Sequence, residues 1–279
     1  MKNAELLPKN VTNRIFRMKY VVSVFLPLFF LVVFVFIVYA IDQNYPTSGD
    51  AVIRQVVGQM LNKDPNSLDT KDFRSITELD LSGQTIEDIR LLKKFKNLCK
   101  LDISSLKVPK ARTPLWKTIL IKIHVIKKQT PQVLFRSPKK EEITFLNLRS
   151  LRNLSKLEYL NLNFTPIENL GPLSGLKNLT TLDVYGTHVF DLGPVKELSN
   201  LKILNLGQTK ITNLKPLQEL TKLQRLTLYD TAISDIEPVK NFPNLIYFDI
   251  RKCNNILHNQ IDDLQKKLPE LVIFDGREK

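Results

Sequence analysis

Three histidines, two cysteines and a row of aspartates are the residues of this 279-residue chain whose chemistry suits catalysis or metal binding. The histidines, His124, His188 and His258, fall at unrelated places in the pattern described below. The sequence has no H-E-x-x-H zinc motif, no G-x-S-x-G nucleophile motif and no Walker phosphate-binding loop. We therefore expect no enzyme activity and no cofactor.

The aspartates recur at one position of a repeated pattern, as a row of cation sites would require. Asp80, Asp102, Asp183 and Asp249 hold this position, but Asn161, Asn205 and Thr227 interrupt the row. No more than two carboxylates are consecutive, whereas a hard cation such as calcium takes six to eight oxygen ligands. We expect no metal site there.

The cysteines test the architecture. Cys99 and Cys253 lie six strand steps apart in the predicted fold, which is roughly 29 Å at about 4.8 Å per step. A disulfide needs Cα atoms within about 7 Å, so these two cysteines should not pair. Cys253 is predicted to be a structural residue of a buried turn, and Cys99 a free thiol.

A leucine pattern of fixed period organises the chain. The pattern L-x-x-L-x-L recurs every 22 residues, with a weaker copy at Leu120-Ile123-Val125 followed by an insertion of 15 residues. Such a period is typical of a solenoid of leucine-rich repeats. We predict about eight repeats over residues 76–256, with a parallel sheet on the concave face. The copies begin at Leu157, Leu179, Leu201, Leu223 and Leu245, and upstream at Ile76 and Leu98.

Two further rows describe the rest of each repeat. Proline recurs on the return side, where it fixes φ and lacks the N–H that a strand needs, so short 3₁₀ or extended turns are predicted there. Threonine recurs in the turn after each strand, where its hydroxyl can bond loop backbone. The rows are Pro172, Pro194, Pro216 and Pro238, and Thr165, Thr187, Thr209 and Thr231, with Cys253 next in the threonine row.

Repeats such as LTTLDVYGTHVFDLGPVKELSN resemble the 22-residue class of the internalin family of bacterial leucine-rich repeat proteins. The segment AVIRQVVGQMLNKDPNSLDTKDFRSITELDLSGQTIEDI is similar to the helical cap that such proteins carry before their first strand. The resemblance covers roughly residues 50–275. It departs in having threonine in place of the family's ladder asparagine and an irregular region at 104–142.

Both ends of the solenoid need caps, because an open end exposes the core. We predict a helical cap over residues 51–75, with a helix from Ala51 to Leu61 and Asp50 as its N-cap. The C-terminal cap, residues 257–279, should contain a short helix over Gln260–Leu268 and a last strand at 271–274. The helix positions expected to face the core are Val52, Val56, Val57 and Met60.

Residues 20–41 form an uncharged stretch that suits a transmembrane helix, at roughly 33 Å for 22 residues. The basic residues 1–19 precede it and a linker, 42–50, follows. The positive-inside rule then leaves the N-terminus in the cytoplasm and places the repeats outside it, in a periplasm or at the cell surface. Small residues near Ala40 also permit signal-peptide cleavage there, so anchor and cleaved signal both stay open.

The net charge of +13 is concentrated rather than spread. Residues 104–140 hold ten basic and no acidic residues, inside the irregular insertion at 104–142. This segment suits anionic lipid or an acidic polymer, but it lacks the interleaved aromatic residues of a nucleic-acid platform. The basic patch candidates are Lys107, Lys110, Arg112, Lys117, Lys127, Lys128, Arg136, Lys139 and Lys140.

Residues between the strand leucines should project from the concave face. Tyrosines and arginines, which dominate binding energy at protein interfaces, gather there in the later repeats. We therefore predict that the chain binds a protein partner. The alternatives are an envelope-associated structural protein held by the basic segment, and a regulatory subunit of a phosphatase-type partner, in which related repeats occur. The partner-binding candidates are Tyr159, Tyr185, Arg225, Tyr229, Tyr247 and Arg251.

Overall fold

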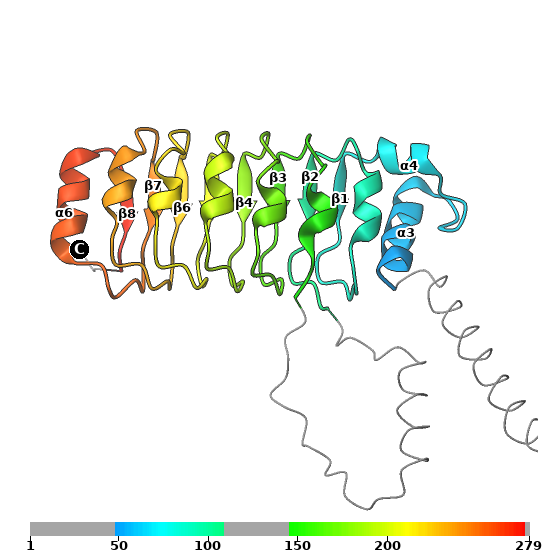
Figure 1. Cartoon of the computed structure of the whole chain (residues 1–279), viewed down its shortest axis with the longest axis horizontal. Coiled ribbons are helices and arrows are strands. Elements are labelled where there is room, and N and C mark those ends of the chain that lie inside the picture. Colours follow the sequence, from blue (N-terminus) through cyan, green and yellow to red (C-terminus); the bar gives the residue numbers. More distant parts are fainter. Residues whose placement is uncertain (1–47, 109–144, 277–279) are drawn as a thin grey trace, which may run out of the picture. The chain divides into compact units, whose positions relative to one another are not determined.

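The computed structural model describes residues 48–108 and 145–276, which belong to one compact unit. Its strands form a single parallel sheet in which each strand pairs with the next one along the chain (Figure 1). The predicted leucine-rich repeat solenoid is confirmed. The eight strands are β1 (Glu78–Asp80), β2 (Lys100–Asp102), β3 (Tyr159–Asn161), β4 (Thr181–Asp183), β5 (Ile203–Asn205), β6 (Arg225–Thr227), β7 (Tyr247–Asp249) and β8 (Val272–Phe274).

Each strand of β1 to β7 buries its central residue, and its two flanking residues lie on the other face of the sheet. Of these flanking residues only Asp249 of β7 is itself buried. Leu182, Leu204 and Leu226 pair in register across β4, β5 and β6, and all three are at most 1% exposed. The side chains of a strand alternate between its two faces, so three residues are enough to divide core from concave surface. The concave face is therefore built from the residues that flank the buried leucines.

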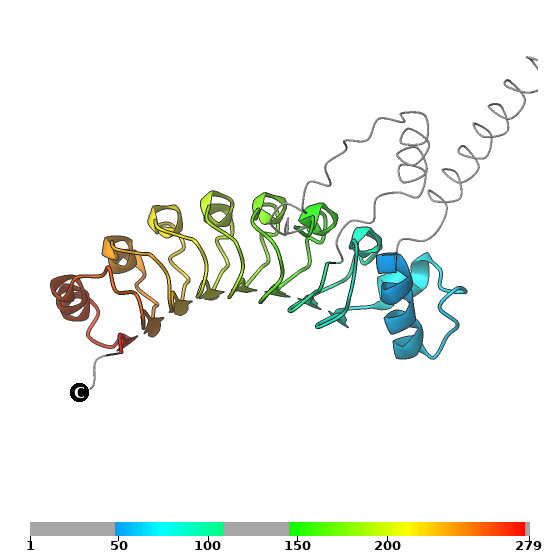
Figure 2. The same ribbon diagram turned by 90° about the horizontal axis from the view of Figure 1, so that it is seen from below.

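The opposite side of the solenoid consists of short 3₁₀ helices, as the proline row predicts (Figure 2). The last four each have one proline in the first two positions of the helix. A backbone N–H at these positions would have no acceptor within the helix, so proline costs no hydrogen bond there. Because these helices are wider than the strands, the sheet lies on the concave side of the curve in Figure 2. The 3₁₀ helices are η2 (Arg90–Lys94), η3 (Leu148–Leu151), η4 (Gly171–Leu173), η5 (Gly193–Glu197), η6 (Lys215–Leu217) and η7 (Glu237–Asn241).

Helices close both ends of the core. Helix α3 (Ser48–Leu61) and the short α4 (Thr70–Ser75) cover the first strand, and α6 (His258–Lys267) precedes β8 at the other end. The predicted Asp50 cap was wrong, because the helix starts at Ser48, three residues before the predicted start, and Asp50 lies in its first turn. Of the four α3 positions predicted to face the core, only Val57 is fully buried.

Helix α3 buries Ile53 and Val57 completely, while Val52 and Val56 are only half-buried. Met60 was predicted to face the core, but its side chain is 51% exposed. Ile53 and Val57 are four residues apart and so lie on one side of the helix, and Met60 lies at the edge of that side. Its exposure leaves an apolar side chain beside the concave face.

The irregular region differs most from the prediction. Strand β2 pairs directly with β3, although Asp102 and Asn161 are 59 residues apart. No strand from the weak copy at 120–125 lies between them, and that copy itself lies outside the described residues. Leu148, Leu151 and Leu154 are buried and complete the repeat that begins at Leu98. The part of the solenoid that the structure describes thus has seven repeat strands, closed by the cap strand β8.

The threonine row lies buried in the turns, as predicted. The hydroxyls of Thr165, Thr187 and Thr209 donate to backbone carbonyl oxygens at 2.8, 2.7 and 2.6 Å. Cys253 continues the row: its Sγ lies 3.3 Å from Thr231 Oγ1 and 3.0 Å from the carbonyl oxygen of Leu228. Both cysteines are free thiols. They lie five strand steps apart rather than the predicted six, because β2 pairs directly with β3.

A second polar row, not predicted from the repeat pattern, links successive repeats just before each strand. The side-chain amides of Asn178, Asn200 and Asn244 donate to backbone carbonyl oxygens of the preceding repeat at 2.8 to 2.9 Å. Where lysine takes the position, as at Lys222, its Nζ donates instead to the Asn200 side chain at 2.7 Å. Asparagine therefore does form a ladder here, at a different position from the threonine row.

The proposed membrane segment, residues 20–41, lies outside the described residues. Within 48–108 and 145–276, no helix has both the length and the apolar character needed to cross a bilayer.

Candidate protein-binding surface

The predicted binding residues lie on the strands and on the turn that follows each strand. In this turn the backbone ladder of the sheet continues. The N–H of Phe164 donates to the backbone carbonyl oxygen of Tyr185 at 2.8 Å, and the N–H of Gln208 donates to that of Tyr229 at 2.7 Å. The Asp183 carboxylate also accepts the Tyr185 N–H at 3.2 Å. The backbone beneath the tyrosines is therefore fixed, and their rings project from a rigid support.

Three aromatic rings form a continuous row along these turns. Phe164 meets Tyr185 edge to face, with ring centroids 5.2 Å apart, and Tyr185 lies 6.4 Å from Tyr229. Tyr185 and Tyr229 are two repeats apart, so their backbones are separated by roughly 9.6 Å at about 4.8 Å per strand. The closer approach of the rings is possible because glycine, Gly207, holds the position between them.

Gly207 leaves the space that the Tyr185 ring occupies. A Cβ atom at Gly207 would lie 2.7 and 2.8 Å from two atoms of that ring and 3.2 Å from the Tyr229 carbonyl oxygen. Any side chain there would push the Tyr185 ring away from Tyr229. The absence of a side chain at Gly207 thus allows Tyr185 and Tyr229, from different repeats, to lie close together on one surface.

We predict that Gly207→Ala will separate the tyrosine pair while costing only about 1 kcal/mol of stability, because a surface ring can move aside. NMR of ring-labelled tyrosine should show shifted Tyr185 and Tyr229 signals, and affinity for a protein partner should fall about 10-fold, near 1.4 kcal/mol. Gly175→Ala is the matched control, since its Cβ would meet no atom nearer than 3.8 Å. Unmoved tyrosine signals in Gly207→Ala would contradict this account.

Cations lie over the aromatic rings at the C-terminal side of this row. The Arg225 guanidinium lies 4.2 Å from the centroid of Tyr247, and Lys252 Nζ lies 5.1 Å from that of Tyr229. Hydrogen bonding to Tyr229 raises the pKa of Lys252 further above neutral. Cation–π contacts of this kind hold a charged group at the surface without neutralising it.

Arg251 is held differently, by a carboxylate. Its guanidinium donates to both oxygens of Asp249 at 3.0 and 2.7 Å, and it lies 5.6 Å from the Tyr229 ring. Hydrogen bonding to Asp249, which is 2% exposed, raises the pKa of Arg251. The two hydrogen bonds to Asp249 fix the plane of the guanidinium group, so Arg251 is held in one position at the surface.

The last strand extends the surface. Phe274 on β8 packs against Tyr247 with centroids 5.0 Å apart, and Arg251 lies 5.9 Å from the Phe274 ring. Contacts therefore link the turn residues to the strand residues. We call the whole set the aromatic–cation surface; it consists of Phe164, Tyr185, Arg225, Tyr229, Tyr247, Arg251, Lys252 and Phe274.

Five of the six predicted binding residues belong to this surface, and Tyr159 does not. Tyr159 lies on β3, where burial and the nearby Asp102 raise the pKa of its hydroxyl. Phe164, Lys252 and Phe274 were missed. Phe164 and Lys252 each follow the predicted row by one position, and Phe274 lies outside the 22-residue frame, so a wider window around the row would have found the first two.

Phe164 occupies a backbone position that suits glycine. Its φ is 53°, in the left-handed region, and the equivalent residues Gly83 and Gly186 have φ of 68° and 66°. The other equivalent residues, which are not glycine, also have positive φ: Ser105, Gln208, Asp230 and Lys252. A side chain at such a φ costs roughly 1–2 kcal/mol, and the Phe164 ring is 57% exposed. A large apolar ring kept exposed at such a position makes Phe164 a candidate for binding.

We predict that Phe164→Gly will leave stability within about 1 kcal/mol of the parent chain, because the relief of strain offsets the lost ring contacts. Affinity for a protein partner should nevertheless fall by at least about 5-fold, near 1 kcal/mol. Urea denaturation and binding measurements on the same preparations test both parts. A large loss of stability with unchanged binding would show that Phe164 serves the fold instead.

The basic patch candidates and the aspartate row are not part of the aromatic–cation surface. Of the basic patch candidates only Lys107 is described; it is exposed and pairs with Thr85 through a parallel bridge, and the others lie outside the described residues.

The aspartate row has a structural role in the turns that follow the strands. Asp80 and Asp102 each accept the backbone N–H two residues ahead at 2.8 Å, and the asparagines that interrupt the row do the same.

The fold and this surface define a leucine-rich repeat protein. The sequence profile described as leucine-rich repeats, two copies, matches residues 199–241. Proteins of this fold commonly mediate protein–protein interaction and are typically binding scaffolds without enzyme activity.

Solved structures give the neighbours of this chain, whereas no curated protein sequence matches it. An internalin C2 from Listeria monocytogenes is 24% identical with a TM-score of 0.56, covering 81% of this chain and 92% of that one. The internalin InlF of the same organism is 21% identical with a TM-score of 0.59, covering 86% and 65%. A leucine-rich repeat protein of Leptospira interrogans is also 21% identical, with a TM-score of 0.52 and coverage of 73% and 50%. These likenesses show the fold.

Proposed function

We propose that this chain captures a protein partner through its aromatic–cation surface. The observation that carries the proposal is a row of aromatic rings on a fixed backbone, with three cations against them. Phe164 and Phe274 are exposed, and Tyr185, Tyr229 and Tyr247 are half-buried. Aromatic residues and arginine supply most of the binding energy at protein interfaces and need little ordering when their supports are rigid. A surface of this kind matches a partner that offers apolar and acidic groups together.

The proposal includes a membrane anchor formed by residues 20–41, with the repeats on the far side of the membrane. It is supported by the uncharged 22-residue stretch and by the basic residues that precede it. Alkaline phosphatase needs an oxidising compartment to fold, so a fusion after residue 279 should be active. An inactive fusion, when the same enzyme behind a cleaved signal peptide is active in the same cells, would contradict the proposed topology.

Crosslinking in intact cells tests the capture function. Cells producing the full-length chain are treated with a short crosslinker, and the products are identified by mass spectrometry. We expect one protein to be enriched with the parent chain and lost when Arg225→Glu reverses the charge beside Tyr247. Equal recovery with both chains would argue against this surface.

The insertion supports a second candidate function, attachment to an anionic surface. Because β2 pairs directly with β3, residues 109–144 are not needed to continue the sheet, yet this stretch contains most of the ten basic residues. Deleting 109–144 should leave the solenoid folded but abolish salt-sensitive binding to vesicles rich in anionic lipid. Unchanged vesicle binding after the deletion would reject the attachment role, and partner capture through the aromatic–cation surface should be unaffected.

A further inference from the structure

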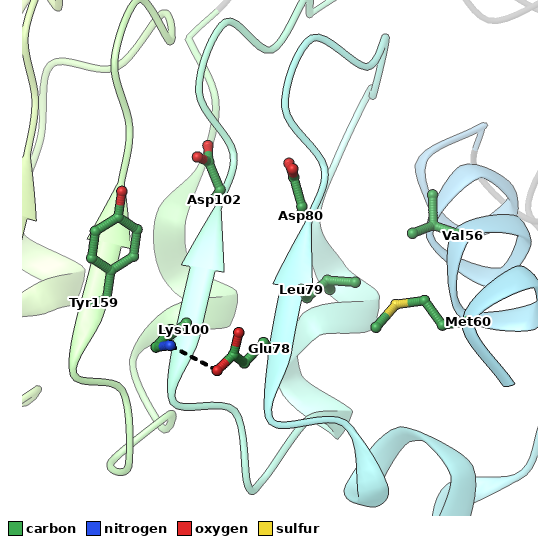
Figure 3. Close-up of a pocket in the computed structure, with 8 residues that line it drawn as sticks. All are labelled: Val56, Met60, Glu78, Leu79, Asp80, Lys100, Asp102 and Tyr159. Carbon is green, nitrogen blue, oxygen red and sulfur yellow. Dashed lines mark ion pairs between the residues drawn. The ribbon is translucent and has the colours of Figure 1, made fainter.

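A pocket of about 630 Å³ lies at the opposite end of the concave face from the aromatic–cation surface. Helix α3 forms one side of it and strands β1 to β3 the other (Figure 3). No residue of the aromatic–cation surface reaches it. It is lined by Val56, Met60, Glu78, Leu79, Asp80, Lys100, Asp102 and Tyr159.

The helix side of the pocket is apolar. In Figure 3 the Met60 side chain extends from α3 toward Leu79 on β1, with Val56 above it on the same helix. Met60 is the residue predicted to be core that is instead 51% exposed. Its flexible thioether can adapt to a partner side chain, as methionine does at many binding surfaces.

The strand side carries carboxylates. Glu78 pairs with Lys100 at 2.8 Å, which leaves Asp80 and Asp102 as the charges of this wall without an ion pair among the described residues. Their Oδ1 atoms accept N–H groups of the following turns at 2.8 Å, so both carboxylates are fixed in place. Asp102 Oδ2 also accepts from the Asn161 amide at 2.9 Å.

The third wall is aromatic. In Figure 3 the Tyr159 ring stands beside Asp102, with its hydroxyl at the same end of the strands as the two carboxylates. An apolar wall, an aromatic ring and two fixed carboxylates together suit a group with an apolar stem and a cationic head. A metal ion does not suit the pocket, because no group of three or more ligand residues that could hold one occurs in the described residues.

We propose that this pocket receives an arginine or lysine side chain of the protein partner. The methylene stem lies along Met60 and Leu79, and the cationic head meets Asp80, Asp102 and the Tyr159 ring. The inference rests on the proposed function in assuming a protein partner, but it concerns a separate site. The pocket also defines the orientation of the bound partner. The basic group of the partner faces α3, and the acidic and apolar groups of the partner face Arg225 and Lys252.

Met60 itself reports on the pocket. The chain has three methionines, and the other two, Met1 and Met18, lie far from it in sequence. The full-length chain, labelled with carbon-13 at the methionine methyl groups and kept in mild detergent, is titrated with the peptide acetyl-Ala-Leu-Arg-Leu-Ala-amide. The probe for comparison carries citrulline, a neutral group of the same shape, in place of arginine. The Met60 signal is assigned by its loss in Met60→Leu.

We expect the Met60 signal to shift in a saturable way with the arginine peptide, and at least 5-fold more weakly with the citrulline peptide. The double variant Asp80→Asn/Asp102→Asn should abolish this difference. Asparagine keeps the turn acceptor and already holds the position in Asn161 and Asn205, so the fold should persist. Asp183→Asn, which changes the same row outside the pocket, is the matched control and should bind as the parent does.

Equal shifts with both peptides, or an unchanged preference in the double variant, would overturn the inference. Neither experiment involves Tyr185 or Tyr229. Failure of the pocket therefore leaves the proposed function of the aromatic–cation surface standing, and failure of that surface leaves a positive peptide result intact.

Discussion

Replacing Tyr185 and Tyr229 together with alanine should weaken partner binding at least about 100-fold, because interface hot spots cost roughly 2 kcal/mol or more each when truncated. Both rings project from the sheet, and the backbone beneath them is bonded independently of the side chains. Burial raises the pKa of the Tyr185 hydroxyl, with Tyr229 as the next contribution, so the ring remains neutral at physiological pH. Its loss removes apolar contact area and no charge.

The measurement is the affinity of the purified chain for the captured partner, with circular dichroism and thermal unfolding recorded on the same samples. Phe190→Ala/Ile246→Ala is the matched control, since it also removes two apolar side chains, 61% and 57% exposed, that lie outside the aromatic–cation surface. The control should bind as the parent chain does. Unchanged affinity in the tyrosine variant would show that the partner contacts a different face.

Leu204→Ala should destabilise the solenoid by about 3–4 kcal/mol, within the range found when a buried leucine is truncated in a well-packed core. Leu204 is 1% exposed at the centre of β5, between Leu182 and Leu226 in register. A solenoid repeat contacts only its neighbours, so a cavity in one repeat weakens two interfaces at once. Few single changes in this fold should cost more.

Urea denaturation tests this value, and the adjacent residue supplies the control. Ile203 lies in the same strand but faces the concave surface and is 38% exposed. Ile203→Ala should therefore cost less than about 1 kcal/mol, because little buried area is lost. Similar losses for the two variants would mean that the division between core and concave face is wrong.

The repeated part of the fold was predictable because each residue type meets the same environment in every copy. Leucine at the strand centre, proline at the start of a 3₁₀ helix and threonine in the buried turn each have a local physical reason that holds from repeat to repeat. Where the repetition fails, so did the prediction. The weaker copy at 120–125 still has apolar residues at the strand spacing, and only the direct pairing of β2 with β3 shows that the sheet continues without it.

The candidate site was predictable as a row of residues but not as a surface. The outward positions of Tyr185, Tyr229 and Arg251 follow from strand alternation. The tilt that brings two tyrosine rings to 6.4 Å depends on the empty volume above Gly207, which a repeat pattern does not reveal. Phe274 joined the site because the last strand continues the sheet after a helical cap, out of the 22-residue frame.

The pocket beside α3 was missed for a similar reason. Met60 has the spacing of a core residue, and the apolar period of a helix does not distinguish its buried side from the edge of that side. The position of the edge is set by where the helix crosses the end of the sheet, as Figure 2 shows. Packing between elements, rather than local pattern, decides it.

The most direct test of the proposed function places a photocrosslinking residue, benzoylphenylalanine, at Tyr229 of the full-length chain in the cells that produce it. Its counterpart carries the same residue at Lys196, which is exposed on the 3₁₀ helix η5 of the convex side. Illumination should join the chain to one protein from position 229 and not from position 196, and the product should disappear when Tyr185→Ala is added. Equal crosslinking from both positions, or a product that persists with Tyr185→Ala, would contradict capture through the aromatic–cation surface.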